Sequence, residues 1–270
     1  LPCYMLYTIT QRFTAADLLK MLPELRFPAL SMVILFGIAT AVARIFAVRQ
    51  DRRGLFISMF FNSNTVFIGL PINLALFGAR SVPYVLVYYM ANTTFFWTLG
   101  VWLIQHDGMK EAKIDFKQAL GKLFSPPLLG FMLAVVLVAL HIRLPKFIIS
   151  TCAYLGNLTI PMSMLFIGIV LSNAGLSRIR FTRDAWGILL GRFLLAPLLM
   201  TILVLPSNMP LMMKQVFILQ AAMPVMTNAP VVSRMYHADY NYAAIMVTET
   251  TTLSIIVIPI LMVAIKTLVH

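Results

Sequence analysis

Long apolar stretches separated by short charged gaps run along the whole chain. A helix that crosses the hydrocarbon core of a bilayer needs about 20 mostly apolar residues, and most of these stretches reach that length. The pattern predicts spans over residues 27–47, 55–77, 82–105, 125–141, 147–172, 185–206, 212–235 and 241–266, with a partial span over residues 1–10. We therefore expect one all-α integral membrane domain.

Two of these spans are interrupted at matching places in the two halves of the chain. Asn62, Asn64, Gly69 and Pro71 fall within the first, and Pro224, Asn228 and Pro230 within the second. An interrupted membrane helix frees backbone groups that hydrocarbon cannot satisfy, so protein or a water-filled cavity must cover it. Two interrupted spans in corresponding positions indicate the midplane binding site of a secondary transporter.

The composition supports a membrane protein, with 60% hydrophobic and 11% charged residues and a mean hydropathy of +0.89. The net charge of +12 does not indicate nucleic-acid binding, because the basic residues gather in alternate gaps. The gaps that are rich in Lys and Arg, at residues 44–53, 110–122 and 178–183, are expected to be cytoplasmic. The exception is the gap at residues 11–26, which has Arg12, Lys20 and Arg26 on the expected outer side.

Residue types that form disulfides, bind metals or catalyse reactions in other proteins are sparse in this chain. Cys3 and Cys152 both fall in predicted spans, which excludes a disulfide scaffold, and no His/Cys cluster has the spacing of metal ligands. The four histidines fall in loops or at the C-terminal end, and one intramembrane glutamate cannot form a pair of catalytic acids. We expect no metal, no cofactor and no enzymatic activity.

The second half of the chain repeats the first with an offset of 159 positions, which places Pro2 on Pro161 and Pro71 on Pro230. Residues 1–105 form the first unit and residues 106–270 the second. An odd number of spans per unit gives the two copies opposite orientations. Because the first unit has fewer spans, we expect an N-terminal truncation of about one and a half helices, roughly 35–45 residues on the repeat count.

Several strings, in their order and spacing, resemble the auxin efflux carrier family, which includes plant PIN-type auxin carriers and bacterial malonate-type permeases. They are Asn64–Pro71, Phe96–Gly100, Ser125–Leu129, Ile160–Gly168 and Ala222–Asn228. The resemblance implies ten helices in two inverted repeats of five, with crossed broken helices. It also implies a scaffold, here residues 1–10 and 125–172, and a mobile transport domain, here residues 27–105 and 185–266. Any homodimer would be built on the scaffold helices.

The substrate-binding residues are expected at the two interruptions and on the helix after the first. Opened helix ends present N–H dipoles that suit a carboxylate, and asparagine can donate or accept without a fixed charge. The expected set is Asn62, Asn64, Thr65, Pro71, Asn92, Met226, Thr227, Asn228 and Pro230. The alternative for each interruption alone is an ordinary kinked helix.

Glu249 is the one acidic residue well inside a predicted span, and intramembrane carboxylates are costly and usually functional. It is either a protonation site that couples transport or the partner of Arg192, the one basic residue comparably deep. Both readings stay open at this point.

The sequence favours a carrier of small organic anions that works by alternating access in the cell membrane, the plasma or bacterial inner membrane. The expected partners are a small organic acid and the lipid bilayer. The first alternative keeps the fold but changes the cargo, as in an ion-coupled symporter or antiporter. Neither interruption contains Asp or Glu to bind a cation, which favours the anion. A membrane sensor without an output domain is the other alternative.

Overall fold

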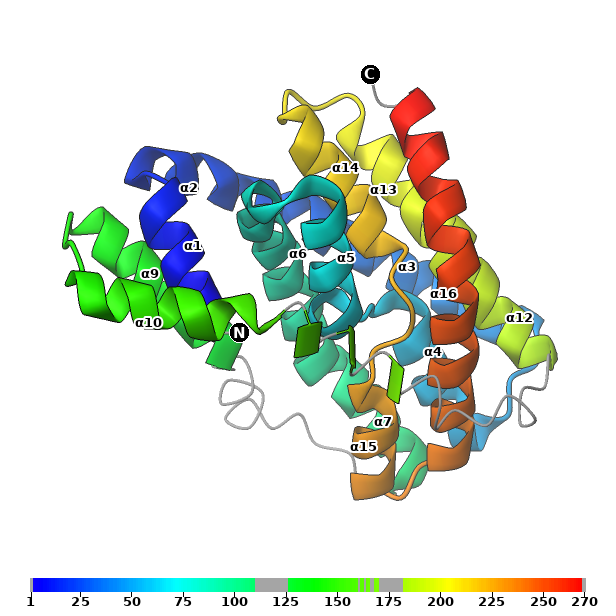
Figure 1. Cartoon of the computed structure of the whole chain (residues 1–270). Helices are drawn as coiled ribbons and strands as arrows, with labels where there is room; N and C mark the ends of the chain where they lie inside the picture. Colours follow the sequence, from blue (N-terminus) through cyan, green and yellow to red (C-terminus); the bar gives the residue numbers. More distant parts are fainter. Residues whose placement is uncertain are drawn as a thin grey trace.

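The computed structural model describes residues 2–109, 126–159, 161–162, 164–165, 168–169 and 182–268. Within these residues the regular elements are all helices (Figure 1). The truncated N-terminal unit, the ten-helix count and the inverted repeat stay predictions.

The first half of the chain contains α1 to α7 and several short helical turns. In order, these are α1 (Pro2–Arg12), α2 (Ala15–Met21), η1 (Leu22–Leu25), α3 (Arg26–Ile45), η2 (Gln50–Arg52), α4 (Arg53–Phe61), η3 (Thr65–Gly69), α5 (Leu70–Phe77), η4 (Ala79–Ser81), α6 (Val82–Phe95), η5 (Phe96–Gly100) and α7 (Val101–Gly108). The elements η3 and η5 are π-helical turns.

The second half contains α9 (Pro126–Ala139), α10 (Lys146–Asn157), α12 (Arg183–Leu190), the π-helical turn η7 (Gly191–Leu195), α13 (Ala196–Val204), α14 (Leu211–Ala221), α15 (Asn228–Met235) and α16 (Tyr240–Leu268). The predicted span over residues 147–172 corresponds to α10, and several of its later residues lie outside the described part.

The gap at residues 11–26 contains a helix that the hydrophobic pattern did not predict. Thr14 caps α2 in a capping box: its hydroxyl accepts a hydrogen bond from the N–H of Asp17, and the Asp17 carboxylate accepts from the N–H of Thr14. The Thr-x-x-Asp spacing is a variant of the usual capping signature. It was the feature of the sequence from which the start of α2 could have been predicted.

Two hydrophobic clusters hold the helices together. The larger includes Leu35, Phe60, Phe217 and Met246, and so joins α3, α4, α14 and α16. The smaller joins α1, α2 and α9 to α5 and α6, through residues such as Met5, Phe131 and Leu86. Figure 1 shows α1, α9 and α10 gathered on one side of the molecule, where α1 packs against both other helices.

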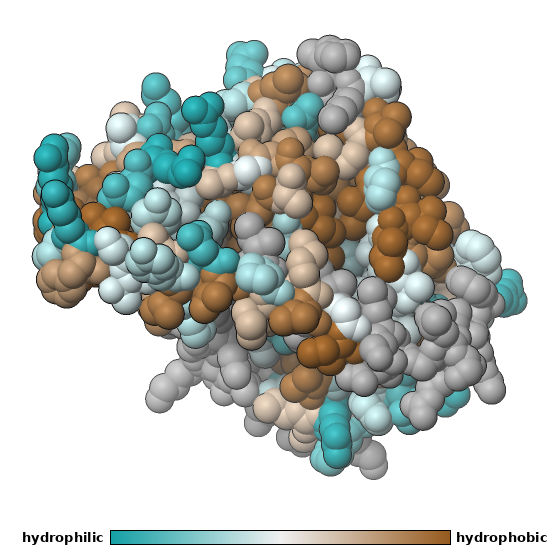
Figure 2. Space-filling view, in the orientation of Figure 1, coloured by the Kyte–Doolittle hydropathy of each residue, from teal (hydrophilic) through white to brown (hydrophobic). Residues whose placement is uncertain are grey.

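The outer surface has the apolar character that a bilayer requires. Ile256, Ile260 and Val263 of α16 are each more than 60% exposed, and Figure 2 shows brown, hydrophobic atoms over this helix. Such large exposed apolar surfaces are unusual on soluble monomers. Three helical stretches within the described residues are long and apolar enough to cross a membrane: Ala15–Ile45, Arg183–Val204 and Tyr240–Ile265.

Two of the other predicted spans are divided into shorter pieces. The span over residues 55–77 is divided into α4, η3 and α5, and the span over residues 212–235 into α14 and α15. The span over residues 82–105, in contrast, is one continuous helical path through α6, η5 and α7. A hydropathy pattern reports only the apolar length of such a span and not a break inside it.

The gaps between spans, as far as the structure describes them, collect at two ends of the molecule. At one end Arg52 pairs with Asp184, and Asp107 accepts hydrogen bonds from the N–H groups of Gly54 and Leu55. At the other end, the gaps at residues 11–26, 78–81 and 206–210 contribute to one cavity. Of the gaps expected to be cytoplasmic, residues 44–53 and the described residues 182–183 lie at the first end. Residues 110–122 and 178–181 lie outside the described part.

Candidate substrate site at the helix crossover

The two interrupted helices meet at their breaks. Residues 62–64 and 222–227 leave the α-helical path. Ser63 and Val225 form an isolated antiparallel bridge, and the N–H of Asn64 donates to the carbonyl of Pro224 at 2.8 Å. The crossover, defined here as residues 62–65 and 222–228, therefore pairs backbone with backbone inside the molecule.

The prolines lie slightly later than the sequence pattern indicated. We expected Pro71 and Pro230 to make the breaks, but Pro71 lies in the first turn of α5 and Pro230 in the first turn of α15. The first turn of α15 tolerates Pro230 because its N–H groups have no partner within the helix. Pro71 instead follows the π-helical turn η3, which forms one continuous helix with α5 from Thr65 onward. Asn62 and Asn64 lie in the non-helical backbone of the first break, whereas Asn228 is the first residue of α15.

Asn92 of α6 satisfies the backbone of the first break. Its amide nitrogen donates to the carbonyl of Ser63 at 2.8 Å, and its amide oxygen accepts from the N–H of Ser63 at 2.9 Å. Asn92 and Ser63 are both fully buried. This side chain replaces the pair of hydrogen bonds that a neighbouring strand would supply, so its first role is to hold the break in shape.

The second break is held from α16 and linked back to the first. The hydroxyl of Thr250 accepts a hydrogen bond from the N–H of Val225 at 3.1 Å. Gln220, at the end of α14, donates from its amide to the carbonyl of Thr65 at 3.3 Å. Gly69 permits this approach, because a Cβ there would lie 2.4 Å from the Gln220 Oε1 atom.

Arg192 binds the carboxyl-terminal ends of both broken helices. Its guanidinium donates to the carbonyl of Phe60 at 3.2 Å, to that of Met223 at 2.9 and 3.1 Å, and to that of Ala221. The side chain is 0% exposed. The last carbonyls of a helix lack partners within it and carry partial negative charge, so one cation satisfies and neutralises both ends.

Arg192 is thus bound to the main chain. Within the described residues, its hydrogen bonds go to main-chain carbonyls. Both readings of Glu249, as a coupling site and as the partner of Arg192, stay predictions. Glu249 is 1% exposed and lies on α16 beside Thr250, the residue that holds the second break.

The asparagines of the first break use only part of their hydrogen-bonding capacity. Asn62 donates to the carbonyl of Ser58 at 3.1 Å, and Asn64 accepts from the N–H of Phe67 at 3.2 Å. Among the described residues, the amide oxygen of Asn62 and the amide nitrogen of Asn64 have no partner. Both side chains are at least 98% buried, and an unused buried polar group is costly.

The remaining expected residues divide by burial. Thr65 and Met226 are buried in the crossover, whereas Thr227, Asn228 and Pro230 are half-buried. The structure thus brings the two asparagines of the first break together with Thr65, Asn92 and Met226. It leaves the Asn228 side chain at the margin of this group.

Sequence reasoning missed Ser63, Gln220 and Thr250. Ser63 acts through its backbone, which carries no side-chain signal. Gln220 is a polar residue inside an apolar span, and that position was a signal in the sequence. Thr250 belongs to a run of threonines. Its hydroxyl donates a hydrogen bond to the carbonyl of Met246, at 2.7 Å, and accepts one from the N–H of Val225.

Comparison with known proteins identifies the family of the chain. A family model described as "Membrane transport protein" matches residues 1–262. The chain belongs to this family. It is the auxin efflux carrier family that the sequence motifs predicted. A similar protein is the "Uncharacterized transporter MJ1031" of Methanocaldococcus jannaschii, with 26% identity over 266 residues that cover 96% of this chain and 83% of that protein.

Membership of this transport family, together with the apolar helices, makes the chain a membrane-embedded transporter. Both comparisons describe transport, the class that the sequence favoured over an enzyme. The crossover is the polar, buried part of this transporter at which both halves of the chain meet.

Proposed function

We propose that this transporter is a secondary active carrier of small organic anions, and that the crossover is its substrate site. The observation that carries the proposal is the charge balance of the four broken-helix ends. Each helix end is equivalent to about half a unit charge. Arg192 offsets the two carboxyl-terminal ends, of α4 and α14.

The two amino-terminal ends, of η3 and α15, lack such an opposite charge from the crossover residues. Neither interruption contains Asp or Glu, so about one unit of partial positive charge faces the crossover. The unused amide nitrogen of Asn64 adds a buried donor at the same place. A carboxylate supplies both the negative charge and the acceptors that this arrangement lacks.

The same reasoning disfavours a cation as the cargo. A desolvated cation needs carboxylate or carbonyl oxygens, and Arg192 already occupies the carbonyls of Phe60, Ala221 and Met223. A bound cation would also lie close to a buried guanidinium. An ion-coupled carrier of another cargo would have to place its ion elsewhere.

We further propose that α1, α9 and α10 belong to a scaffold and that the helices around the crossover form the moving body. The smaller hydrophobic cluster, which joins α1, α2 and α9 to α5 and α6, forms the boundary between them. Glu249 is the proposed coupling residue, because it is the buried carboxyl group adjacent to the Thr250 contact with the second break. The carrier is placed in the plasma or bacterial inner membrane.

Uptake by the purified protein in liposomes tests this function. The assay should compare a dicarboxylate, a keto acid and an indole acid with a neutral sugar and with sodium. Saturable uptake of at least one acid, accelerated by an inward proton gradient, is the expected result. Uptake of sodium or sugar without any acid would contradict the anion assignment. A thermal-shift screen with the same acids gives an independent measure of binding.

A further inference from the structure

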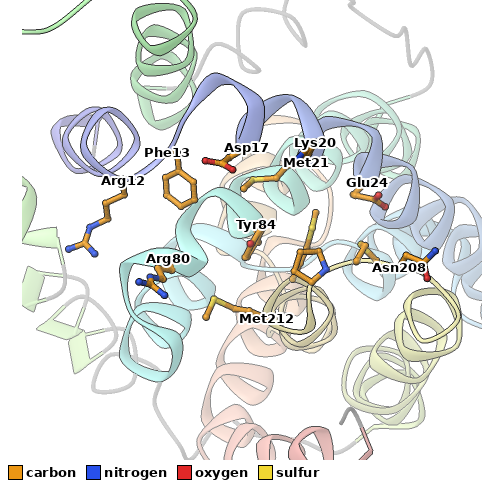
Figure 3. A pocket seen from close by; sticks show the side chains of 13 residues that line it. Arg12, Phe13, Asp17, Lys20, Met21, Glu24, Arg80, Tyr84, Asn208 and Met212 are labelled. Atoms are coloured by element: carbon orange, nitrogen blue, oxygen red, sulfur yellow. The ribbon is translucent and has the colours of Figure 1, made fainter. Parts of the chain in front are cut away.

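A cavity of about 860 Å³ lies at the end of the molecule expected to face outward. It is bounded by α1 and α2 on one side and by α6 and α14 on the other (Figure 3). Five of its lining residues are charged: Arg12, Asp17, Lys20, Glu24 and Arg80. It therefore lies along the boundary between the proposed scaffold and the proposed moving body.

The basic residues outnumber the acids in this cavity, and one of its two acids is paired with an arginine outside the lining. The Asp17 carboxylate accepts hydrogen bonds from both the hydroxyl and the N–H of Thr14, and Glu24 pairs with Arg26 at 3.6 Å. Within the described part of the chain, no hydrogen bond or ion pair holds Arg12, Lys20 or Arg80. All three are exposed, so the cavity offers an excess of available positive charge.

Two helices lead from this cavity to the crossover. On α6, Tyr84 lines the cavity, and Tyr88 and Asn92 follow at intervals of four residues on the same face. Eight residues of helix extend about 12 Å. On α14, Met213 lines the cavity and Gln220 lies two turns further on.

Between the cavity and the crossover stands one aromatic pair. The rings of Tyr88 on α6 and Phe217 on α14 meet edge to face with their centroids 6.1 Å apart, and both are fully buried. In this structure, therefore, the cavity is open at its charged mouth and closed toward Ser63 and Asn92.

We propose that this cavity is the outer vestibule of the carrier, in which Arg12, Lys20 and Arg80 concentrate organic anions before they reach the crossover. The inference rests on the proposed anion transport and adds the residues that recognise the anion outside the crossover. A cleft whose lining has a net excess of one sign of charge raises the local concentration of the opposite ion. The vestibule also accounts for Arg12 and Lys20 as basic residues in an outer gap, against the usual charge bias.

Two measurements test the vestibule. The first is acid uptake by an R12Q/R80Q variant and by K214Q, a control in which Lys214 is outside the cavity lining and donates to the carbonyl of Leu205. We expect the KM of R12Q/R80Q to rise about tenfold at low salt, with kcat nearly unchanged, because steering by charge acts on the approach of the anion. Added salt should reduce this difference, and K214Q should resemble the wild type.

The second measurement does not depend on transport. Phenylglyoxal labels accessible arginines, and its reaction with Arg12 and Arg80 is followed by mass spectrometry with succinate or indole-3-acetate present. Exposed Arg143, outside the cavity lining, is the control. We expect the acids to slow labelling of Arg12 and Arg80 severalfold and to leave Arg143 unaffected. Thermal unfolding of each variant verifies that it is folded.

The outcomes separate the two proposals. Normal acid uptake with an unchanged KM in R12Q/R80Q and no protection from labelling would overturn the vestibule and leave the transport function in place. Protection of both arginines without uptake of any acid by the wild type would support the anion site and overturn the transport function. Neither protection nor uptake would overturn both.

Discussion

The side-chain amide of Asn92 pairs with the backbone of Ser63 through two hydrogen bonds, of 2.8 and 2.9 Å. A side chain on helix α6 thereby gives an extended residue the pair of backbone hydrogen bonds that a neighbouring β-strand would normally provide. The pairing explains how a membrane protein can contain non-helical backbone at depth without exposing it to lipid.

Replacing Asn92 by alanine leaves the buried N–H and carbonyl of Ser63 without these partners. Each unsatisfied group costs about 1–3 kcal/mol, so N92A should lower the free energy of unfolding by about 2–6 kcal/mol. Thr94 on the same helix is exposed and bonds only within its own helix, to Met90. Thermal unfolding in detergent should show a large loss for N92A and little change for T94A; similar losses would contradict the pairing role.

Arg192 should tolerate no replacement, including lysine. A single ammonium group lacks the planar fork with which the guanidinium reaches the carbonyls of Phe60, Ala221 and Met223. We expect R192K to lower the unfolding temperature clearly and R192L to prevent stable folding. R183K, at the exposed start of the same span, is the control and should unfold like the wild type. An R192K variant with wild-type stability and uptake would show that the fork is not needed.

Two substitutions of Asn64 separate the effect of an added negative charge from the effect of a lost hydrogen bond. Asp at this position keeps an acceptor for the N–H of Phe67, loses the unused donor and adds a negative charge. Two unit charges about 4 Å apart repel by about 4 kcal/mol at an effective dielectric of 20, which weakens binding of an organic acid about a thousandfold. N64A should cost less, on the order of 1–3 kcal/mol. Equal losses in a binding assay would be evidence against an anion at the crossover.

Gly69 and Gln220 should be energetically coupled. A methyl group on Gly69 would lie 2.4 Å from the Gln220 Oε1 atom, so G69A forces the glutamine out of place and should cost about 1–3 kcal/mol. Removing the glutamine in G69A/Q220A relieves this contact, and the double variant should lose less stability than the sum of the single variants. At Gly37 a Cβ would meet nothing within 4 Å, so G37A should be neutral or stabilising. Additive losses would show that the two residues do not contact each other as described.

Asp107 should give the protein a pH-dependent stability at the end that is expected to be cytoplasmic. Burial raises the pKa of its carboxyl group from 3.8 to about 6, against the lowering effect of hydrogen bonds from Leu55 and Gly54. The folded protein therefore binds more protons than the unfolded chain between about pH 4 and 6, so this contribution to stability falls as the pH rises through that window. Lowering the pH from 7 to 4 should stabilise the wild type relative to D107N. Parallel unfolding temperatures of the two proteins across that range would rule out the raised pKa.

Sequence reasoning predicted the helical class and the two interruptions, because each depends on local composition, and it predicted the transport family from the resemblance of several strings in their order and spacing. Apolar length reports a span, and proline with asparagine inside it reports a break. The exact contacts of the break could not be predicted in this way. Ser63 and Val225 are 162 positions apart, and their bridge depends on how two distant helices pack. Arg192 was found by its depth, but its partners are carbonyls, which every residue carries and no sequence pattern marks.

The hydrogen bonds described at the crossover come from α4, α6, η7, α14 and α16, and none comes from α1, α2, α9 or α10. The pieces of the two breaks are thus bound into one unit that shares an apolar boundary with α1, α2 and α9. Sliding along such a boundary exchanges one set of nondirectional contacts for another, and no crossover hydrogen bond has to be exchanged with it. The energy barrier of the transport cycle would then depend on side-chain shape along α2, α6 and α9. One bulky substitution there could slow turnover without altering the affinity for the substrate.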